Sequence, residues 1–190
     1  MAQQLLEIDY THAHLFGGVG GGAMGFNRAT ARLGRLAGRL RCLGSIDVDA
    51  AACRAFERNV GAPATAMDLF DYEQYVAWHG RPPPAGWREA TPADLRRAFQ
   101  NRRPDLGFLS APCKGFSGLL PESTSRLPKY EALNRLTLRG VWLWLEAFQD
   151  DPTPLIFFEN VPLILARGRG LLDQIAGLFQ AYGYAWAETT

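Results

Sequence analysis

The stretch FGGVGGG at residues 16–22 constrains the fold of this chain more than any other feature. Residues 12–16, which end at its first residue, have the character of a short strand, and residues 23–40 after it have helical spacing. Glycines between a strand and a helix let backbone amides approach a ligand closely, and the helix N-terminus favours negatively charged groups. The pattern predicts a strand-turn-helix unit that binds a nucleotide-like ligand. A glycine turn that binds nothing also fits this stretch when it is taken alone.

Strand-like and helix-like segments alternate along the rest of the chain. Their order predicts strands at residues 41–47, 62–67, 105–110 and 155–158, and a further strand beginning at 184–188. Helices are predicted at residues 50–59, 92–100, 129–149 and 171–182. Residues 72–90 include RPPPAGW and lack periodicity, so they predict a loop insertion. This alternation is typical of an α/β fold with a mostly parallel sheet and helices on both faces, here as a single domain over residues 1–190.

Composition narrows the class of protein. A chain of 190 residues with 47% hydrophobic side chains can bury the core of one compact domain. Its net charge of +1 provides no overall attraction to nucleic acid or to a membrane. The apolar runs are too short to span a bilayer and the N-terminus lacks a signal pattern, which predicts a cytoplasmic protein with no membrane partner. The three histidines and three cysteines show no metal-ligand spacing, so we expect no metal, and Cys42 and Cys53 are expected to be packing residues.

Acidic residues follow two of the predicted strands. Asp47 ends the second strand, where a carboxylate can accept hydrogen bonds from both hydroxyls of a ribose. Asp49, two residues later, is expected to cap the following helix. Asp68 follows the third strand and can either bind an adenine amino group or satisfy the backbone of its own turn.

Cys113 lies in the segment PCKGFSG, directly after the fourth predicted strand. A cysteine framed by proline and glycine is not an obvious core residue, and the neighbouring Lys114 favours the thiolate, which is the nucleophilic form. This context indicates a nucleophile, and a structural cysteine is the alternative.

Glu159 begins the segment ENVP, directly after the apolar strand LIFF. A carboxyl group at the end of a buried strand is expected to have a raised pKa, which suits a proton donor near neutral pH. A Glu-Asn pair that forms a turn or caps a helix is the alternative.

Taken together, these segments resemble the DNA cytosine 5-methyltransferase family in order and in approximate spacing. The family's first motif, Phe-x-Gly-x-Gly-Gly, is matched by Phe16, Gly18, Gly20 and Gly21, and its Pro-Cys motif is similar to Pro112-Cys113. Its Glu-Asn-Val motif is present at residues 159–161. The resemblance covers residues 12–188, with residues 72–90 as the least family-like part.

The resemblance implies a Rossmann-like methyltransferase fold, incomplete at the C-terminus, and S-adenosylmethionine as cofactor. The implied cofactor-binding residues are Phe16, Gly18, Gly20, Gly21, Asp47, Val48, Asp68, Leu69 and Pro112. The implied catalytic residues are Cys113, which adds to carbon 6 of a flipped cytosine in double-stranded DNA, and Glu159, which protonates the ring. The resemblance also implies that the enzyme is encoded by a bacterium or a phage and acts in restriction-modification.

Some family features do not occur in this chain. Lys114 stands where glutamine is common, His14 stands where an acidic or small residue is common, and the region of Asp68 lacks the usual glycine. The Gln-x-Arg-x-Arg motif and the DNA-recognition region are absent. We therefore expect a fragment, a truncated relic or one half of a split enzyme whose second polypeptide carries the recognition domain.

Three other functions remain open at this point. A non-catalytic subunit could keep the fold and bind S-adenosylmethionine, although intact Pro-Cys and Glu-Asn-Val segments argue against loss of catalysis. A dinucleotide-dependent oxidoreductase shares the glycine turn and the ribose acid but gives no role to Cys113 or Glu159. Transfer RNA is an alternative substrate, because the chemistry on cytosine is the same.

Overall fold

The computed structural model describes residues 5–112 and 128–189. In chain order the elements are β1 (Leu6–Leu15), α1 (Gly21–Arg28), β2 (Thr30–Leu33), β3 (Leu36–Asp47), α2 (Ala50–Val60), β4 (Ala64–Ala66), α3 (Tyr72–His79), α4 (Pro92–Ala98), β5 (Leu106–Ser110), α6 (Pro128–Ala147), β6 (Leu155–Glu159), α7 (Ile164–Arg167) and α8 (Arg169–Ala181). None of the helices in the described part of the chain has the length and apolarity needed to cross a membrane.

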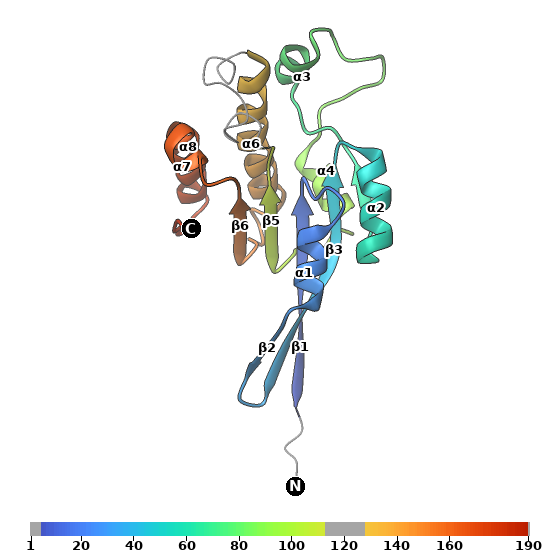
Figure 1. Ribbon diagram of the computed structural model, residues 1–190, viewed down its shortest axis with the longest axis vertical. Coiled ribbons are helices and arrows are strands. Elements are labelled where there is room, and N and C mark those ends of the chain that lie inside the picture. The colour runs from blue at the N-terminus through green and yellow to red at the C-terminus, as the bar shows by residue number, and fades with distance from the viewer. Residues whose placement is uncertain (1–4, 113–127, 190) are drawn as a thin grey trace. The chain divides into compact units, whose positions relative to one another are not determined.

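The strands form one sheet in the order β2-β3-β1-β5-β6, and β4 pairs with β3. β1 is parallel to both β3 and β5, and β4 is parallel to β3. Figure 1 shows the arrows of β1, β3, β5 and β6 pointing the same way. Without the antiparallel β2, the strand order is β4-β3-β1-β5-β6, which is the order of a Rossmann sheet. The predicted α/β class and mostly parallel sheet are confirmed.

The described residues form two compact units. The first comprises residues 5–67, 96–109 and 151–157, and the second comprises residues 68–95, 110–112, 128–150 and 158–189. The first unit holds nearly all of the sheet with α1 and α2, and the second holds α3, α6, α7 and α8. Each unit carries its own part of the predicted site.

The first unit has helical segments on both faces of its sheet, as predicted. On one face, His14 of β1 contacts the rings of Phe26 from α1 and Phe56 from α2. On the other face, the chain that leaves α4 approaches so closely that a Cβ added at Gly44 of β3 would lie 3.0 Å from the carbonyl oxygen of Ala98. Alternating side chains of β1 and β3 therefore enter two different cores.

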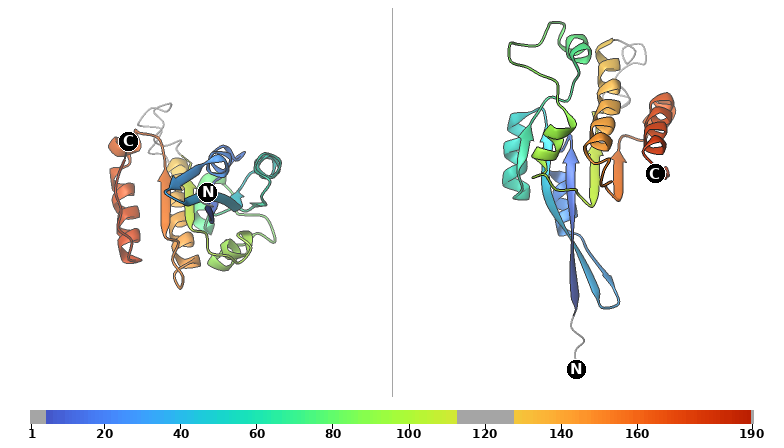
Figure 2. Two further views of the ribbon diagram at one scale, coloured as in Figure 1. Left: turned by 90° about the horizontal axis from the view of Figure 1, so that it is seen from below. Right: turned by 180° about the vertical axis from the view of Figure 1, so that it is seen from behind.

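The predicted helix over residues 23–40 is wrong beyond Arg28. The chain instead turns back as the hairpin β2-β3, with Gly34 at φ +56° in the turn, and β1 begins at Leu6 rather than at His12. Figure 2 shows this hairpin extending beside the N-terminal half of β1. Apolar residues at 33, 36, 37 and 40 fit helical spacing, while the alternation of arginine with apolar residues from residue 39 to 42 fits a strand. The turn at Gly34 and the pairing of β3 with β1 favour the strand over the helix.

Two further predictions are corrected by the structure. Residues 72–90 are not all loop, because Tyr72–His79 forms α3. This helix begins with a capping box, in which Asp71 accepts from the Gln74 amide and the Gln74 side chain accepts from the Asp71 amide. The strand predicted at residues 184–188 is absent from the described structure, where these residues have no regular secondary structure.

Candidate functional site

The glycine turn joins β1 to α1 in the first unit and depends on left-handed backbone. Phe16, Gly18 and Gly20 have φ values of 60°, 52° and 94°. The Phe16 amide donates to the Ile46 carbonyl at 2.8 Å, which fastens the turn to the end of β3. Phe16 is unusual, because residues with a side chain seldom adopt positive φ. The sequence motif thus corresponds to a constrained turn.

Glycine is required at two positions of this turn by the protein itself. A Cβ at Gly17 would overlap the Ser45 Oγ, and one at Gly20 would lie 2.5 Å from a Val60 methyl carbon. Gly21 differs, since nothing lies within 4 Å of the place where its Cβ would be. The absence of a side chain at Gly21 has no internal explanation, which is expected where a ligand approaches the backbone.

α1 begins at Gly21 with Gly20 as its N-cap, and no side chain caps it. Its first turn also contains no acidic residue. The amides at the start of α1 therefore keep their capacity to bind an anionic group from a ligand.

Asp47 connects the glycine turn to the end of β3. Its Oδ2 accepts from the Gly18 amide at 2.9 Å, and its Oδ1 accepts from the Asp49 amide at 3.0 Å. A carboxylate has about four acceptor positions, so both oxygens can also accept from a ligand. Asp49 caps α2 through the amides of Ala51 and Ala52, as predicted. Val48 stands between the two acids with 67% of its surface exposed.

Glu159, in the second unit, is exposed rather than buried, which corrects the expectation from the sequence. Its Oε2 accepts a hydrogen bond from the Ser110 hydroxyl at 2.6 Å. Ser110 ends β5 and Glu159 ends β6. No sequence motif indicated Ser110, although it is the last residue of a predicted strand, which was a usable signal.

The residues around the predicted nucleophile are described only in part. Pro112 is half-buried, and the carbonyl of Ala111 accepts from the Asn160 side chain at 3.4 Å. Cys113 lies outside the described residues, so its assignment stays a prediction.

Asp68 satisfies its own turn in the second unit. Its Oδ1 accepts from the Phe70 amide at 2.9 Å, and its Oδ2 accepts from the Trp87 indole at 3.3 Å. Asp68 therefore has the turn-forming role, one of the two roles that the sequence allowed. Its carboxylate can still accept further hydrogen bonds, for example from a ligand. The next residue, Leu69, is buried, and its carbonyl accepts from Nε of Arg139 at 2.9 Å.

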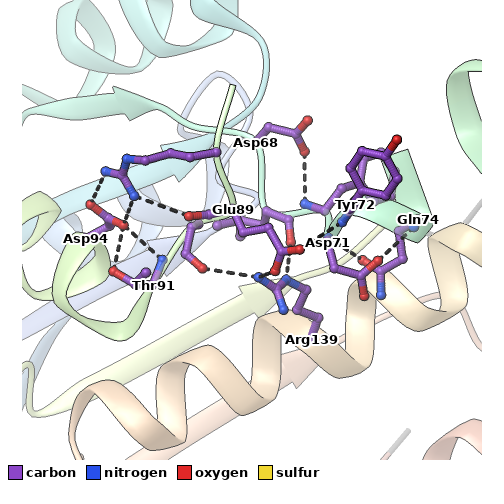
Figure 3. Close-up of polar contacts among 12 residues, drawn as sticks. Asp68, Asp71, Tyr72, Gln74, Glu89, Thr91, Asp94 and Arg139 are labelled. Carbon is purple, nitrogen blue, oxygen red and sulfur yellow. Dashed lines mark hydrogen bonds and ion pairs between the residues drawn. The ribbon is translucent and has the colours of Figure 1, made fainter. Parts of the chain in front are cut away.

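Arg139 of α6 holds the segment that follows Asp68, as Figure 3 shows. Its Nη2 donates to Glu89 at 2.9 Å and to the Ala90 carbonyl at 3.2 Å. Glu89 in turn accepts from the Tyr72 amide at the start of α3. One arginine thus fixes both ends of the inserted segment, a role that no local sequence pattern indicated.

No model of a known protein family matches this chain, and no curated protein matches it. Among solved structures it is similar to the Dnmt2 methyltransferase of S. pombe, with a TM-score of 0.49 and 17% sequence identity over 90% of this chain. The similar region covers 41% of that structure's chain. The present chain therefore spans less than half the length of this neighbour.

Proposed function

We propose that this chain is the cofactor-binding and catalytic part of a DNA cytosine 5-methyltransferase that uses S-adenosylmethionine. The observation that carries the proposal is the hydrogen bond from the Gly18 amide to Asp47, because it joins the first two motifs of the resemblance in one arrangement. The order of the later motifs around Cys113 and Glu159 distinguishes this function from that of an oxidoreductase.

The first unit offers groups that suit S-adenosylmethionine. The uncapped start of α1 can receive the carboxylate of its amino acid part, and Asp47 can accept from the ribose hydroxyls. Val48 offers an exposed apolar surface to a base. Three further residues were proposed from the sequence as cofactor contacts: Asp68, Leu69 and Pro112. We assign them to the adenine and to the methyl-bearing end of S-adenosylmethionine. When bound, the cofactor supplies the methyl group.

The proposed chemistry begins with the Cys113 thiolate, which adds to carbon 6 of cytosine. Glu159 protonates ring nitrogen 3 in the same step, so negative charge does not accumulate on the ring. Carbon 5 becomes nucleophilic and takes the methyl group. A base then removes the proton from carbon 5, the thiolate leaves carbon 6, and the proton on ring nitrogen 3 returns to Glu159. The Ser110 hydroxyl bonded to Glu159 limits the orientations of that carboxyl group.

Binding of the cofactor is the first test. Isothermal calorimetry should detect binding of S-adenosylmethionine and of its demethylated product to the chain. Binding of a nicotinamide dinucleotide instead would favour an oxidoreductase. The substrate is tested with DNA and transfer RNA that carry 5-fluorocytosine, because fluorine at carbon 5 blocks elimination and traps the covalent adduct. The chain is assayed with a polypeptide that supplies a recognition domain, the partner proposed from the sequence. Cys113→Ser should abolish the adduct, and an adduct on RNA alone would exclude DNA as substrate.

A further inference from the structure

Two histidines and one cysteine lie together inside the first unit, although the sequence predicts no metal there. His12 and His14 are two positions apart in β1, so their side chains point to the same face of the sheet, and Cys42 of β3 is the register partner of His12. One ring nitrogen of each histidine and the Cys42 Sγ all lie within 4.8 Å of one another. The three residues are 0%, 2% and 9% exposed.

Asn27 of α1 fixes the protonation pattern of this cluster. Its Oδ1 accepts from the Cys42 amide at 3.1 Å, and because an amide nitrogen can only donate, the oxygen must face the cluster. The same Oδ1 lies 2.9 Å from His12 Nε2, so that nitrogen carries the proton. His12 Nδ1 is then unprotonated and faces His14 Nε2 at 2.8 Å. An outer hydrogen bond of this kind orients most histidines that bind metals.

The surroundings of the cluster are apolar. The rings of Phe26, Phe56 and Phe108 contact His14. The charged side chains of β1, and those of β3 that precede Cys42, point to the face of the sheet opposite the cluster. They form ion pairs there, Glu7 with Arg39 and Asp9 with Arg41. Neutral imidazoles and a thiol are the forms that such apolar surroundings favour.

A net charge is costly to bury, so the charge of an ion must be balanced by its ligands. One thiolate balances a monovalent cation completely, whereas a divalent cation would leave one positive charge among the phenylalanine rings. A thiolate with two imidazoles is also a donor set that soft ions prefer.

We propose that His12, His14 and Cys42 form a buried binding site for Cu(I). The ion replaces the proton of the Cys42 thiol, which is released to solvent, so the core stays neutral. His12 coordinates through Nδ1 while Nε2 keeps its bond to Asn27. His14 coordinates through Nε2 after its proton moves to Nδ1.

The required movement is small. Ligand atoms around a single ion lie about 3.5 Å apart, given metal bonds of roughly 2.0–2.3 Å. The histidine pair must open from 2.8 Å, and any wider separation, none of which exceeds 4.8 Å, must close. Asn27 is exposed while its Oδ1 reaches the cluster, so the edge of α1 is the route from solvent.

The test uses Cys113→Ser protein, because Cys113 carries another thiol that could bind the ion. Cu(I) is offered as its bicinchoninate complex under reducing conditions, during refolding and to the folded chain. The expected result is one Cu(I) per chain that resists the competitor, with one sulfur and two nitrogen ligands in X-ray absorption spectra. Cys42→Ser should weaken binding by at least 100-fold, since loss of an outer partner alone costs about 10–100-fold.

Cys53→Ser is the matched control, because Cys53 is also buried but its Sγ contacts the Asp47 carbonyl instead. This variant should bind Cu(I) as the parent does. Circular dichroism verifies the fold, and Cys42→Ala repeats the test if serine disturbs the core. The proposal is overturned if folded parent protein does not bind Cu(I), if Cys42→Ser binds it unchanged, or if Zn²⁺ is preferred. If neither Cu(I) nor Zn²⁺ binds, the histidines are only a hydrogen-bonded pair.

Discussion

The amide nitrogen of Gly18 lies 2.9 Å from Oδ2 of Asp47, which links the turn after β1 to the last residue of β3. The two residues are 29 positions apart in the sequence. Asp47 therefore has a structural role in holding the turn as well as its proposed role in binding ribose. A test of the second role must separate it from the first.

Asp47→Asn should weaken binding of S-adenosylmethionine by about 1.5–3 kcal/mol, the range for a hydrogen bond to a charged group. The free energy of unfolding should also fall by about 1–2 kcal/mol, because one of two backbone amides loses its acceptor. Calorimetry measures the first change and urea denaturation the second. Asp49→Ala is the control, since loss of this helix cap costs about 1 kcal/mol of stability but should leave binding unchanged. Equal binding losses in both variants would contradict the ribose role.

Gly21→Ala should reduce affinity for the cofactor without reducing stability. A Cβ at Gly21 meets nothing within 4 Å, and alanine is favoured over glycine in a helix by up to about 1 kcal/mol. A bound ligand at the start of α1 would meet that methyl group. Gly25→Ala, in the same helix and with equally open space, should gain stability and keep full affinity. Unchanged cofactor affinity in Gly21→Ala would contradict a ligand contact at this position.

Most of the first unit could be predicted because its signals are local. The glycine cluster, the Asp49 cap and the periodicity of α2 each depend on residues close in sequence. The hairpin β2-β3 was missed because Leu33, Leu36, Ala37 and Leu40 satisfy helical spacing equally well, and only pairing with β1 decides between the two. Similarly, the clustering of His12 and His14 with Cys42 depends on which strands are neighbours.

The second unit was predicted less completely because its contacts are long-range. The roles of Arg139 and Ser110 depend on partners 50 and 49 positions away. The exposure of Glu159 was mispredicted for a related reason. The apolar run before it suggested a strand buried on both faces, whereas Leu155 and Phe157 of β6 are 48% and 42% exposed.

Glu159→Gln should slow methyl transfer by about 100-fold or more, the usual contribution of a general acid, while cofactor affinity stays unchanged. Ser110→Ala should cause a smaller loss of about 10-fold, because it removes only the hydrogen bond that orients the carboxyl group. Tritiated methyl transfer with a recognition polypeptide measures both. Glu188→Gln, which alters an exposed pair with Arg169, should leave the rate unchanged. A loss of cofactor affinity equal to the loss of rate would indicate a structural role for Glu159.

Asp94 should be among the strongest polar contributors to the stability of the second unit. Its side chain is 4% exposed and accepts two hydrogen bonds from Arg88, both at 2.6 Å, and two from Thr91. Asp94→Asn should lower the free energy of unfolding by about 2–3 kcal/mol at pH 7, measured by urea denaturation. Glu73→Gln breaks a pair with Arg135 in which both side chains are largely exposed, so it should change stability little.

The effect of Asp94→Asn should also depend on pH in a defined direction. The hydrogen bonds from the Arg88 guanidinium, with those from Thr91, hold the pKa of Asp94 well below its ordinary value of 3.8. A lowered pKa in the folded state stabilises the protein above the unfolded-state value, and that contribution is lost as the pH falls through the folded-state value. The difference between the parent and Asp94→Asn should therefore be constant from pH 7 to pH 5 and shrink steadily below pH 3.8. A difference that stays the same at pH 3 as at pH 7 would show that asparagine acts through packing rather than through loss of the charge.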